Sequence, residues 1–534
     1  MAATIRQASA ADASLWLDLV KVALGDDHPA RQIYDPAWVA SQFDPASGNE
    51  TWLAVNNGRV QASLAFLGAV TQNENPVINV GRNLFRPESF SDGSAEALLR
   101  QVNDVSAKRG HMVIARVLAS DNAQQILFEG QGYTCVGFQP LKHMHRSREG
   151  VLFYVRVQQA ALATRLPLSE SLPQISELAT AALAKLHISN PMHVRDGVTG
   201  YPLKTEIKML EATMDDFELW RQQALSANPA VEISGRFNLG FGYMRTASQA
   251  PLCAVLGQRD ANVVAGLCYY LDDQDRCVRV IDSFSTDDLS LGALLHHVVK
   301  LSQTQLNAVY VEVDILITAP RLLKCAEQLG FVPVAFLPAF YVKSGGHTDV
   351  VKTVKLNMSY SPEATNLTAS AKAIVDIVDH SLQDQKMGVA IINLLRTLPI
   401  FEGLGDGELR KIGRLFTQKL YRPAEKVFNK GDAGNEAYVV MRGQIDICLE
   451  EGAKPIATIG NGQIFGELAF LDGAARAAVA LAGQASILLV VQRTAFNEVV
   501  QREPHLGMVV MKNVAMDLSN KLRRANSALS ALRK

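Results

Sequence analysis

Two stretches of the chain repeat one order of strands and helices, and this duplication constrains the fold more than any other feature. In the first, a strand-like segment at 76–83 leads through RPESFSDGS into the helical AEALLRQVNDVSAKRG. In the second, CVRVIDSF leads through STDDLSLG into ALLHHVVKLSQTQL. A strand, a helix ending in glycine plus an aromatic residue, and a further strand follow in both. Such agreement in order and spacing predicts two copies of one βαβαβ unit.

The length of 534 residues is too great for one core, so we expect several folded units. A stretch rich in Ser, Thr and Asn at 361–372 indicates a linker, and helical apolar spacing follows it. The predicted fold class is a multidomain α+β protein. We predict domains at 1–149 and 150–358, a helical linker at 359–393 and a last domain at 394–534, and residues 150–210 are expected to be a junction.

The composition argues against several classes of partner. Lysine plus arginine (52) balances aspartate plus glutamate (53), so no global charge favours nucleic acid or an anionic membrane. The start lacks a secretory pattern, and no apolar run reaches the roughly 18 residues needed to span a bilayer. Six cysteines are scattered without a CxxC pair. We therefore expect a soluble cytoplasmic protein with reduced thiols, no metal cluster, and neither DNA nor membrane as a partner.

The last domain carries the strongest chemical signal. From Glu425 onward, short strands alternate with glycines, including Gly431, Gly434 and Gly443, which predicts a β-roll with positive-φ corners. Within it lies FGELAFLDGAARAA. The guanidinium of Arg476 matches two oxygens of a phosphate, and the helix start at 466–468 offers free N–H groups to the same anion.

This segment resembles the phosphate-binding cassette of the cyclic-nucleotide-binding family, whose pattern is FGEL followed by Pro-Arg-Ala-Ala. The resemblance implies that Glu467 accepts from the ribose 2′-hydroxyl. Ala475 replaces the usual proline, and Ala477 stands where threonine or serine often accompanies cGMP, so cAMP is the expected ligand and cGMP the less favoured one. A β-roll that has lost its ligand is the alternative. The predicted contact residues are Phe465, Gly466, Glu467, Leu468, Ala469, Arg476, Ala477 and Ala478.

A helix with apolar residues at three-and-four spacing begins near Gly507. In the family such a helix closes over the base; a homodimer seam is an equally good interpretation. The chain ends at Lys534 without the helix-turn-helix of the catabolite activators, which disfavours a transcription factor.

The repeated unit resembles the GNAT acyltransferase fold, in which a glycine-rich loop holds the pyrophosphate of acetyl-CoA or another acyl-CoA. The first copy keeps Gly93, Ser94 and Ala95 of that pattern but lacks its leading Arg or Gln, and Asp92 would repel a pyrophosphate. The second copy, at 287–292, is further from it. The tyrosine of the family corresponds to Phe128 in the first copy and to about Ala326 in the second.

One substitute base is predicted from strand alternation. In VYVEVDI, Tyr310, Glu312 and Asp314 share one face, so Glu312 is the candidate catalytic base if that face lines a cleft. A solvated or helix-paired strand face is the alternative.

Taken together, the residues and resemblances favour a cyclic-nucleotide-regulated N-acyltransferase that acts on an amine, with a protein lysine as a candidate acceptor. The connecting helices at 371–395 are the expected two-state element. A non-catalytic sensor, whose repeats form a scaffold for a protein partner, is the alternative. The sequence leaves open which repeat is active and whether the nucleotide activates or inhibits.

Overall fold

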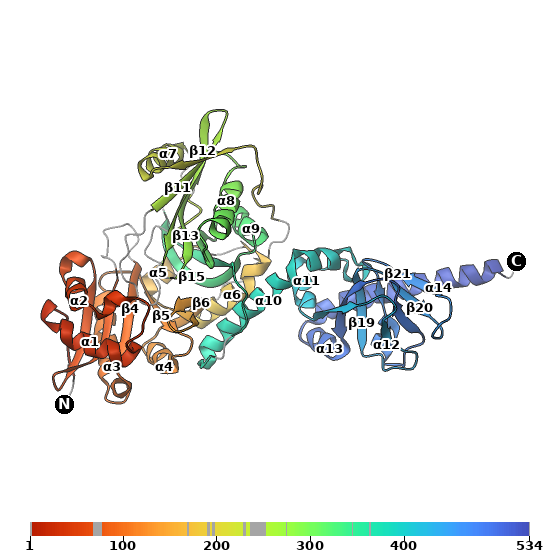
Figure 1. Cartoon of the computed structure of the whole chain (residues 1–534), viewed down its shortest axis with the longest axis horizontal. Helices are drawn as coiled ribbons and strands as arrows, with labels where there is room; N and C mark the ends of the chain where they lie inside the picture. The colour runs from red at the N-terminus through yellow and green to blue at the C-terminus, as the bar shows by residue number, and fades with distance from the viewer. Residues whose placement is uncertain are drawn as a thin grey trace. The chain divides into compact units, whose positions relative to one another are not determined.

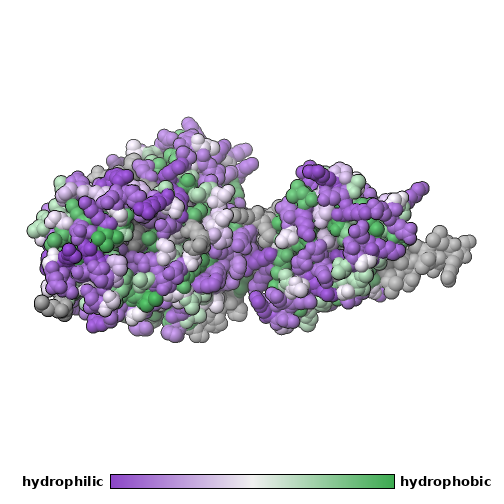
Figure 2. Space-filling view, turned by 60° about the horizontal axis from the view of Figure 1, so that its bottom comes forward, coloured by the Kyte–Doolittle hydropathy of each residue, from purple (hydrophilic) through white to green (hydrophobic). Residues whose placement is uncertain are grey.

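The computed structural model describes residues 3–67, 77–167, 170–188, 193–194, 198–227, 231–234, 252–273, 275–343, 345–362 and 365–532. These residues form two compact units, Met1–Leu382 and Gln383–Lys534. No described helix is long and apolar enough to cross a bilayer. The face drawn in Figure 2 is mostly hydrophilic, with scattered apolar residues.

The first unit is built on one 14-stranded sheet whose two halves have the same strand order. The first half runs β1 (Thr4–Gln7), β2 (Glu50–Asn56), β3 (Arg59–Phe66), β4 (Val77–Phe85), β5 (Met112–Leu118), β7 (Arg148–Val157) and β6 (Thr134–Met144). The second half, taken from its outer edge, runs β10 (Lys208–Ala212), β11 (Leu252–Arg259), β12 (Asn262–Asp272), β13 (Cys277–Ser285), β14 (Tyr310–Leu316), β16 (Gly346–Leu356) and β15 (Val332–Lys343). The predicted duplication is therefore present, as two seven-stranded repeats.

The two repeats meet where β6 pairs with β15, through Gly137 and Ala335. A side chain at Gly137 would lie 2.2 Å from the Ala335 Cβ, so glycine is required for this approach. The predicted boundary at 149/150 needs correction, because it cuts β7. This strand pairs with both β5 and β6 and completes the first repeat.

The first repeat has α1 (Ala13–Leu24), α2 (Pro36–Gln42), α3 (Ser94–Ser106) and α4 (Asn122–Gly130). The second repeat has α7 (Met214–Ala227), α8 (Leu291–Thr304) and α9 (Pro320–Gln328). In the order of elements, α3 follows β4 as α8 follows β13, and α4 follows β5 as α9 follows β14. These four helices are labelled in Figure 1. Between the repeats lie α5 (Gln159–Ala163), α6 (Pro173–Lys185) and the short pair β8 (Glu170–Ser171) and β9 (His193–Val194).

One helix, α10 (Ala369–Thr397), replaces the expected helix pair and crosses the boundary between the units. Its early residues Ala371, Ile374 and Val378 lie in the core of the first unit. Its later residues Ile391 and Leu395 lie in a core of the second unit.

The second unit contains two four-stranded sheets with a shared core, as predicted for a β-roll. One sheet is β17 (Phe416–Tyr421), β24 (Ser486–Gln492), β19 (Glu436–Arg442) and β22 (Ile464–Phe465). The other is β18 (Lys426–Phe428), β23 (Val479–Ala482), β20 (Ile445–Cys448) and β21 (Ala457–Ile459). The helices are α11 (Asp406–Gly413), α12 (Glu467–Asp472), α13 (Arg493–Arg502) and α14 (Pro504–Leu532). Residues from α11, α12, α13 and α14 pack with β19 and β24 in a second core.

Candidate functional site

The backbone at the start of α12 is set by Gly466. This residue has φ of 74° and precedes the helix directly, a conformation that favours glycine. A Cβ at this position would also lie 2.8 Å from Nη1 of Arg476. The glycine of the FGEL pattern is thus needed both for the turn and for the arginine beside it. Of the other predicted corners, Gly431 and Gly443 have positive φ, whereas Gly434 is required by its contact with Ala469.

Arg476 lies inside the roll and is 4% exposed. Its main chain is fixed, because its N–H donates to the Asp432 carbonyl at 2.9 Å and its carbonyl accepts from the Gly431 N–H. Its side chain donates to the carbonyls of Gly466 at 2.8 Å and Glu436 at 2.5 Å.

Within the described part of the chain, no carboxylate balances the charge of Arg476. Its Cζ lies 4.3 Å from the centre of the Phe428 ring, and its Nε has no acceptor among the described residues. No described carboxylate forms an ion pair with it. A buried cation held only by carbonyl dipoles and a ring face retains the capacity to pair with an anion.

Glu467 is the first residue of α12 and is half-buried. It lies at an apolar cavity of about 40 Å³, together with Phe470 of its own helix. Val510, Met511 and Val514 of α14 line the same cavity, so the cassette lies beside the C-terminal helix. Side chains of α14 beyond Asn520 are largely outside the described residues, so the predicted dimer seam there stays a prediction.

The other residues predicted to contact the nucleotide differ in their solvent exposure. Phe465 is buried and stacks on Tyr438 with ring centres 5.0 Å apart, and Ala469 is buried against Gly434. Leu468 is 58% exposed, Ala477 is exposed and Ala478 is half-buried. Sequence reasoning missed Phe428 and the Glu436 carbonyl, because their closeness to Arg476 depends on strand register.

The predicted acyl-CoA loop of the first repeat forms the start of α3. Gly93 has φ of 79° and precedes the helix, and the Asp92 carboxylate accepts from the Ser94 N–H at 2.8 Å. Asp92 therefore caps the helix start. Ala95 is fully buried. Phe128, at the position of the family's tyrosine, is also fully buried and carries no proton donor.

Glu312 does not line a cleft, and its prediction as a base is corrected here. It is 1% exposed and forms ion pairs with Lys352 at 3.1 Å and Lys142 at 3.4 Å. Burial alone would raise the pKa of Glu312, but Lys142, Lys352 and Arg279 outweigh it and hold that pKa well below its ordinary value. The face predicted to be open or solvated is a buried ionic network, because strands of both repeats cover it.

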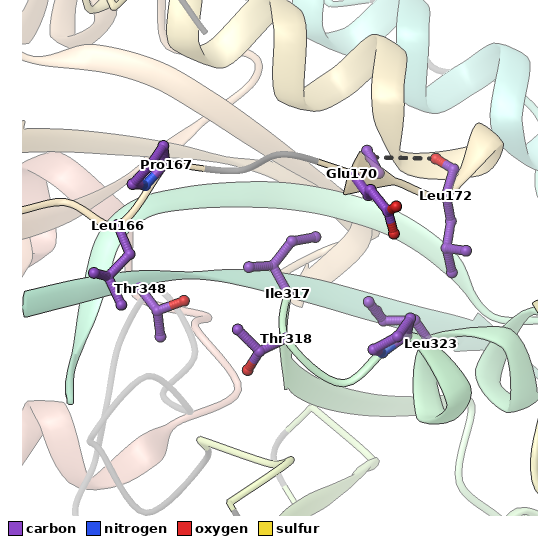
Figure 3. Close-up of a pocket in the computed structure, with 10 residues that line it drawn as sticks. Leu166, Pro167, Glu170, Leu172, Ile317, Thr318, Leu323 and Thr348 are labelled. Carbon is purple, nitrogen blue, oxygen red and sulfur yellow. Dashed lines mark hydrogen bonds between the residues drawn. The ribbon is translucent and has the colours of Figure 1, made fainter. Parts of the chain in front are cut away.

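A cavity of about 310 Å³ lies at the carboxyl end of β14 (Figure 3). Leu166 and Glu170 line one side of it, and Thr318, Leu323 and Thr348 line the other. At the corresponding place in the first repeat, residues 366–368 pack against α4.

Gln125 of α4, which corresponds to Leu323, holds that segment in place. Its side chain donates to the Asn366 carbonyl at 3.2 Å and accepts from the Thr368 N–H at 2.9 Å. The segment leads directly into α10. The first repeat is therefore attached to the helix that crosses between the units, at a place where the second repeat has a cavity.

The comparisons with known proteins concern the second unit. The family model of the cyclic nucleotide-binding domain matches residues 418–503. A cyclic AMP receptor protein of Thermus thermophilus is 31% identical over 137 residues, which is 25% of this chain and 62% of that protein. A cAMP-dependent protein kinase regulatory subunit of Colletotrichum orbiculare is 33% identical over 86 residues, or 16% of this chain and 22% of that protein.

Among solved structures, the Thermus thermophilus catabolite activator protein matches at 31% identity with a TM-score of 0.23, over 25% of this chain and 62% of that one. A cyclic nucleotide-binding domain from Methylobacillus flagellatus matches at 22% identity with a TM-score of 0.25, over 27% of this chain and 83% of that one. The chain thus spans less than two thirds of the curated relatives cited. Residues 418–503 are a cyclic nucleotide-binding domain, which confirms that part of the sequence prediction.

Proposed function

We propose that the chain is a cyclic-AMP-responsive protein whose last domain binds the nucleotide between Arg476 and Glu467. The observation that carries this is the guanidinium of Arg476, which is buried inside the matched domain and has no carboxylate partner among the described residues. Arg476 pairs with the cyclic phosphate, and the main-chain N–H groups after Gly466 donate to the same oxygens. Glu467 accepts from the ribose 2′-hydroxyl. Ala477 has no hydroxyl for a guanine base, which favours cAMP over cGMP.

Titration calorimetry of the full chain with cAMP and cGMP tests this. We expect cAMP to bind more tightly, and Arg476→Ala to weaken it by at least about 2 kcal/mol, or roughly 30-fold. Arg442→Ala, which removes an exposed arginine of β19, is the matched control and is expected to leave affinity unchanged. If neither nucleotide binds at millimolar concentration, the proposal is wrong.

We further propose that the repeats transfer an acyl group from acyl-CoA to an amine, with protein lysine as the candidate acceptor. Two features support this second candidate. Each repeat has the strand order in which the seventh strand lies between the fifth and the sixth. In each, the central parallel pair stops pairing partway, beyond Val80 in β4 and Val280 in β13. The amine would attack the thioester carbonyl, and the CoA thiolate would leave with a proton.

Calorimetry with acetyl-CoA, with and without cAMP, separates this proposal from its alternative. Binding that changes when cAMP is present supports a regulated acyltransferase. If acetyl-CoA binds in neither condition, the repeats are better explained as a scaffold for a protein partner. Because both ligands are intracellular, we place the protein in the cytoplasm.

Regulation would act through α10. A nucleotide shifts an equilibrium only by its different affinities for two states, so an element shared by both units is required. Helix α10 contributes buried residues to cores of both units. Its start is held to α4 of the first repeat through Gln125, which gives nucleotide binding a direct physical connection to that repeat.

A further inference from the structure

Two aromatic rings lie beside the Arg476 guanidinium, at different distances. The Cζ of Arg476 is 4.3 Å from the centre of the Phe428 ring and 5.6 Å from the centre of the Tyr438 ring. A cation is attracted to the face of an aromatic ring within about 6 Å of its centre, and the attraction weakens with distance. Of the two rings, that of Phe428 therefore contributes more to holding this cation.

The Phe428 ring is itself held in place. Phe428 is the last residue of β18, where it pairs with Ala480 of β23. Its ring centre lies 5.7 Å from that of Tyr438 and 6.1 Å from that of Phe465. Packing between rings leaves a side chain few rotamers, so Phe428 presents a fixed face to Arg476.

The loop that follows Phe428 fixes the main chain of Arg476. The Gly431 N–H donates to the Arg476 carbonyl at 2.8 Å, and the Arg476 N–H donates to the Asp432 carbonyl at 2.9 Å. One continuous segment, 428–432, thus contacts both the backbone and the guanidinium of Arg476. The arginine and the ring are therefore fixed relative to one another.

A ring holds a cation without taking its N–H groups. A guanidinium has five N–H donors in its plane. Two of the Arg476 donors go to the carbonyls of Gly466 and Glu436, and Nε is buried with no acceptor in the described part of the chain. A carboxylate in place of the Phe428 ring would take further donors and neutralise the charge. The ring orients the cation and leaves donors and charge to a ligand.

The alternative is that Phe428 only fills the margin of a core. It is a partly buried member of the core that contains Val440, Ile445 and Leu488. Leucine distinguishes the two explanations, because it is apolar and keeps most of the packing but has no aromatic face. If the ring orients Arg476, leucine lowers ligand affinity; if the ring only packs, leucine changes stability alone.

We propose that Phe428 is a positioning residue of the nucleotide site, which acts through Arg476. Its ring holds the guanidinium, with its charge unneutralised, in the orientation that receives the cyclic phosphate. This inference rests on the proposed binding of the nucleotide by Arg476. Because cAMP and cGMP share the cyclic phosphate, loss of the ring weakens both by the same factor, whereas a ring that contacted the base would discriminate between them.

Titration calorimetry of the full chain with cAMP and with cGMP tests the role of the ring. Phe428→Leu is expected to lower the affinity for both nucleotides about fivefold. Phe428→Tyr keeps the ring and is expected to restore affinity to within about twofold. Thermal unfolding followed by circular dichroism checks that the variants fold, and Phe428→Met replaces the leucine variant if that variant does not.

Tyr421→Leu is the matched control. Tyr421 is another partly buried aromatic residue of the same core, and neither ring that meets the Arg476 guanidinium belongs to it. We expect this variant to bind cAMP with unchanged affinity. An equal loss of affinity in Tyr421→Leu and Phe428→Leu would mean that loosening of the core is responsible, and would overturn the inference.

A double-mutant cycle tests whether Phe428 acts through Arg476. In the Arg476→Ala background, Phe428→Leu is expected to cause no further loss of cAMP affinity, because the group that the ring positions is already absent. The same fivefold loss in that background would overturn the inference.

The outcomes separate this inference from the proposed function. If Arg476→Ala weakens cAMP binding and Phe428→Leu does not, the inference is wrong and the proposed function stands. If the unaltered chain binds neither nucleotide, the proposed function is wrong, and the inference that rests on it is wrong as well.

Discussion

Buried charges are handled differently in the two units. In the first unit, the Glu312 carboxylate lies within 4 Å of Lys142, Lys352 and Arg279, so each charge has a partner of opposite sign. In the second unit, Arg476 is also buried, but among the described residues its side chain meets carbonyls and aromatic rings and no carboxylate. The difference separates a charge used for structure from one available to a ligand. Burial of an ionisable group is therefore not enough to identify a functional site.

Of the tests of this comparison, removal of the Glu312 charge is expected to have the largest effect. Glu312→Gln leaves the surrounding cations short of one buried anion. We expect it to lower the free energy of unfolding of the first unit by about 3 to 5 kcal/mol, measured by denaturant titration of the full chain. Glu96→Gln breaks the exposed pair with Arg100 and is the control, with an expected cost of about 0.5 kcal/mol or less. A stable Glu312→Gln protein that has lost acyl transfer would restore Glu312 as a catalytic candidate.

Substitution of Arg476 is expected to weaken ligand binding and to have little effect on stability, the opposite of substitution at Glu312. Arg476→Lys keeps the charge but loses the planar pair of donors, so cAMP affinity is expected to fall by about 1 to 2 kcal/mol, less than for Arg476→Ala. Calorimetry measures this loss. The free energy of unfolding of the second unit is expected to change little, because the lysine still reaches the Gly466 carbonyl. A large loss of stability with unchanged affinity would mean that Arg476, like Glu312, is structural.

The two units are also expected to differ, by a smaller amount, in how much stability they lose as the pH falls. Burial and the nearby His145 lower the pKa of His28 to about 4, and burial and His347 lower the pKa of His111 to about 4. Below a pH of about 6.5 the unfolded chain binds protons that the folded unit excludes until about pH 4, so stability falls as pH falls through this window. The second unit contains one histidine, His505, whose side chain is 70% exposed.

Thermal unfolding followed between pH 7 and pH 4.5 is therefore expected to show the first unit losing stability before the second. His111→Gln is expected to reduce this pH dependence. Equal shifts in both units would show that carboxylates, and not buried histidines, control the acid response.

Prediction from sequence worked best where the determinants are local. Gly466 of the FGEL segment and Arg476 lie ten residues apart. Glycine is required at position 466 by its positive φ and by the closeness of that arginine. The duplication was visible because each repeat carries its strands and helices in the same order. The role of Glu312 was not visible, since Lys142 and Lys352 come from distant parts of the chain.

The sequence by itself determined the cassette, the β-roll and the order of elements in both repeats, because short-range periodicity and turn residues encode them. Only the tertiary structure decided which surfaces are covered. It brought Glu232–Ser234 onto β14, Gln125 onto the segment that leads into α10, and the lysines onto Glu312. These contacts join residues 40 to 243 positions apart, and such separation leaves no local pattern in the sequence.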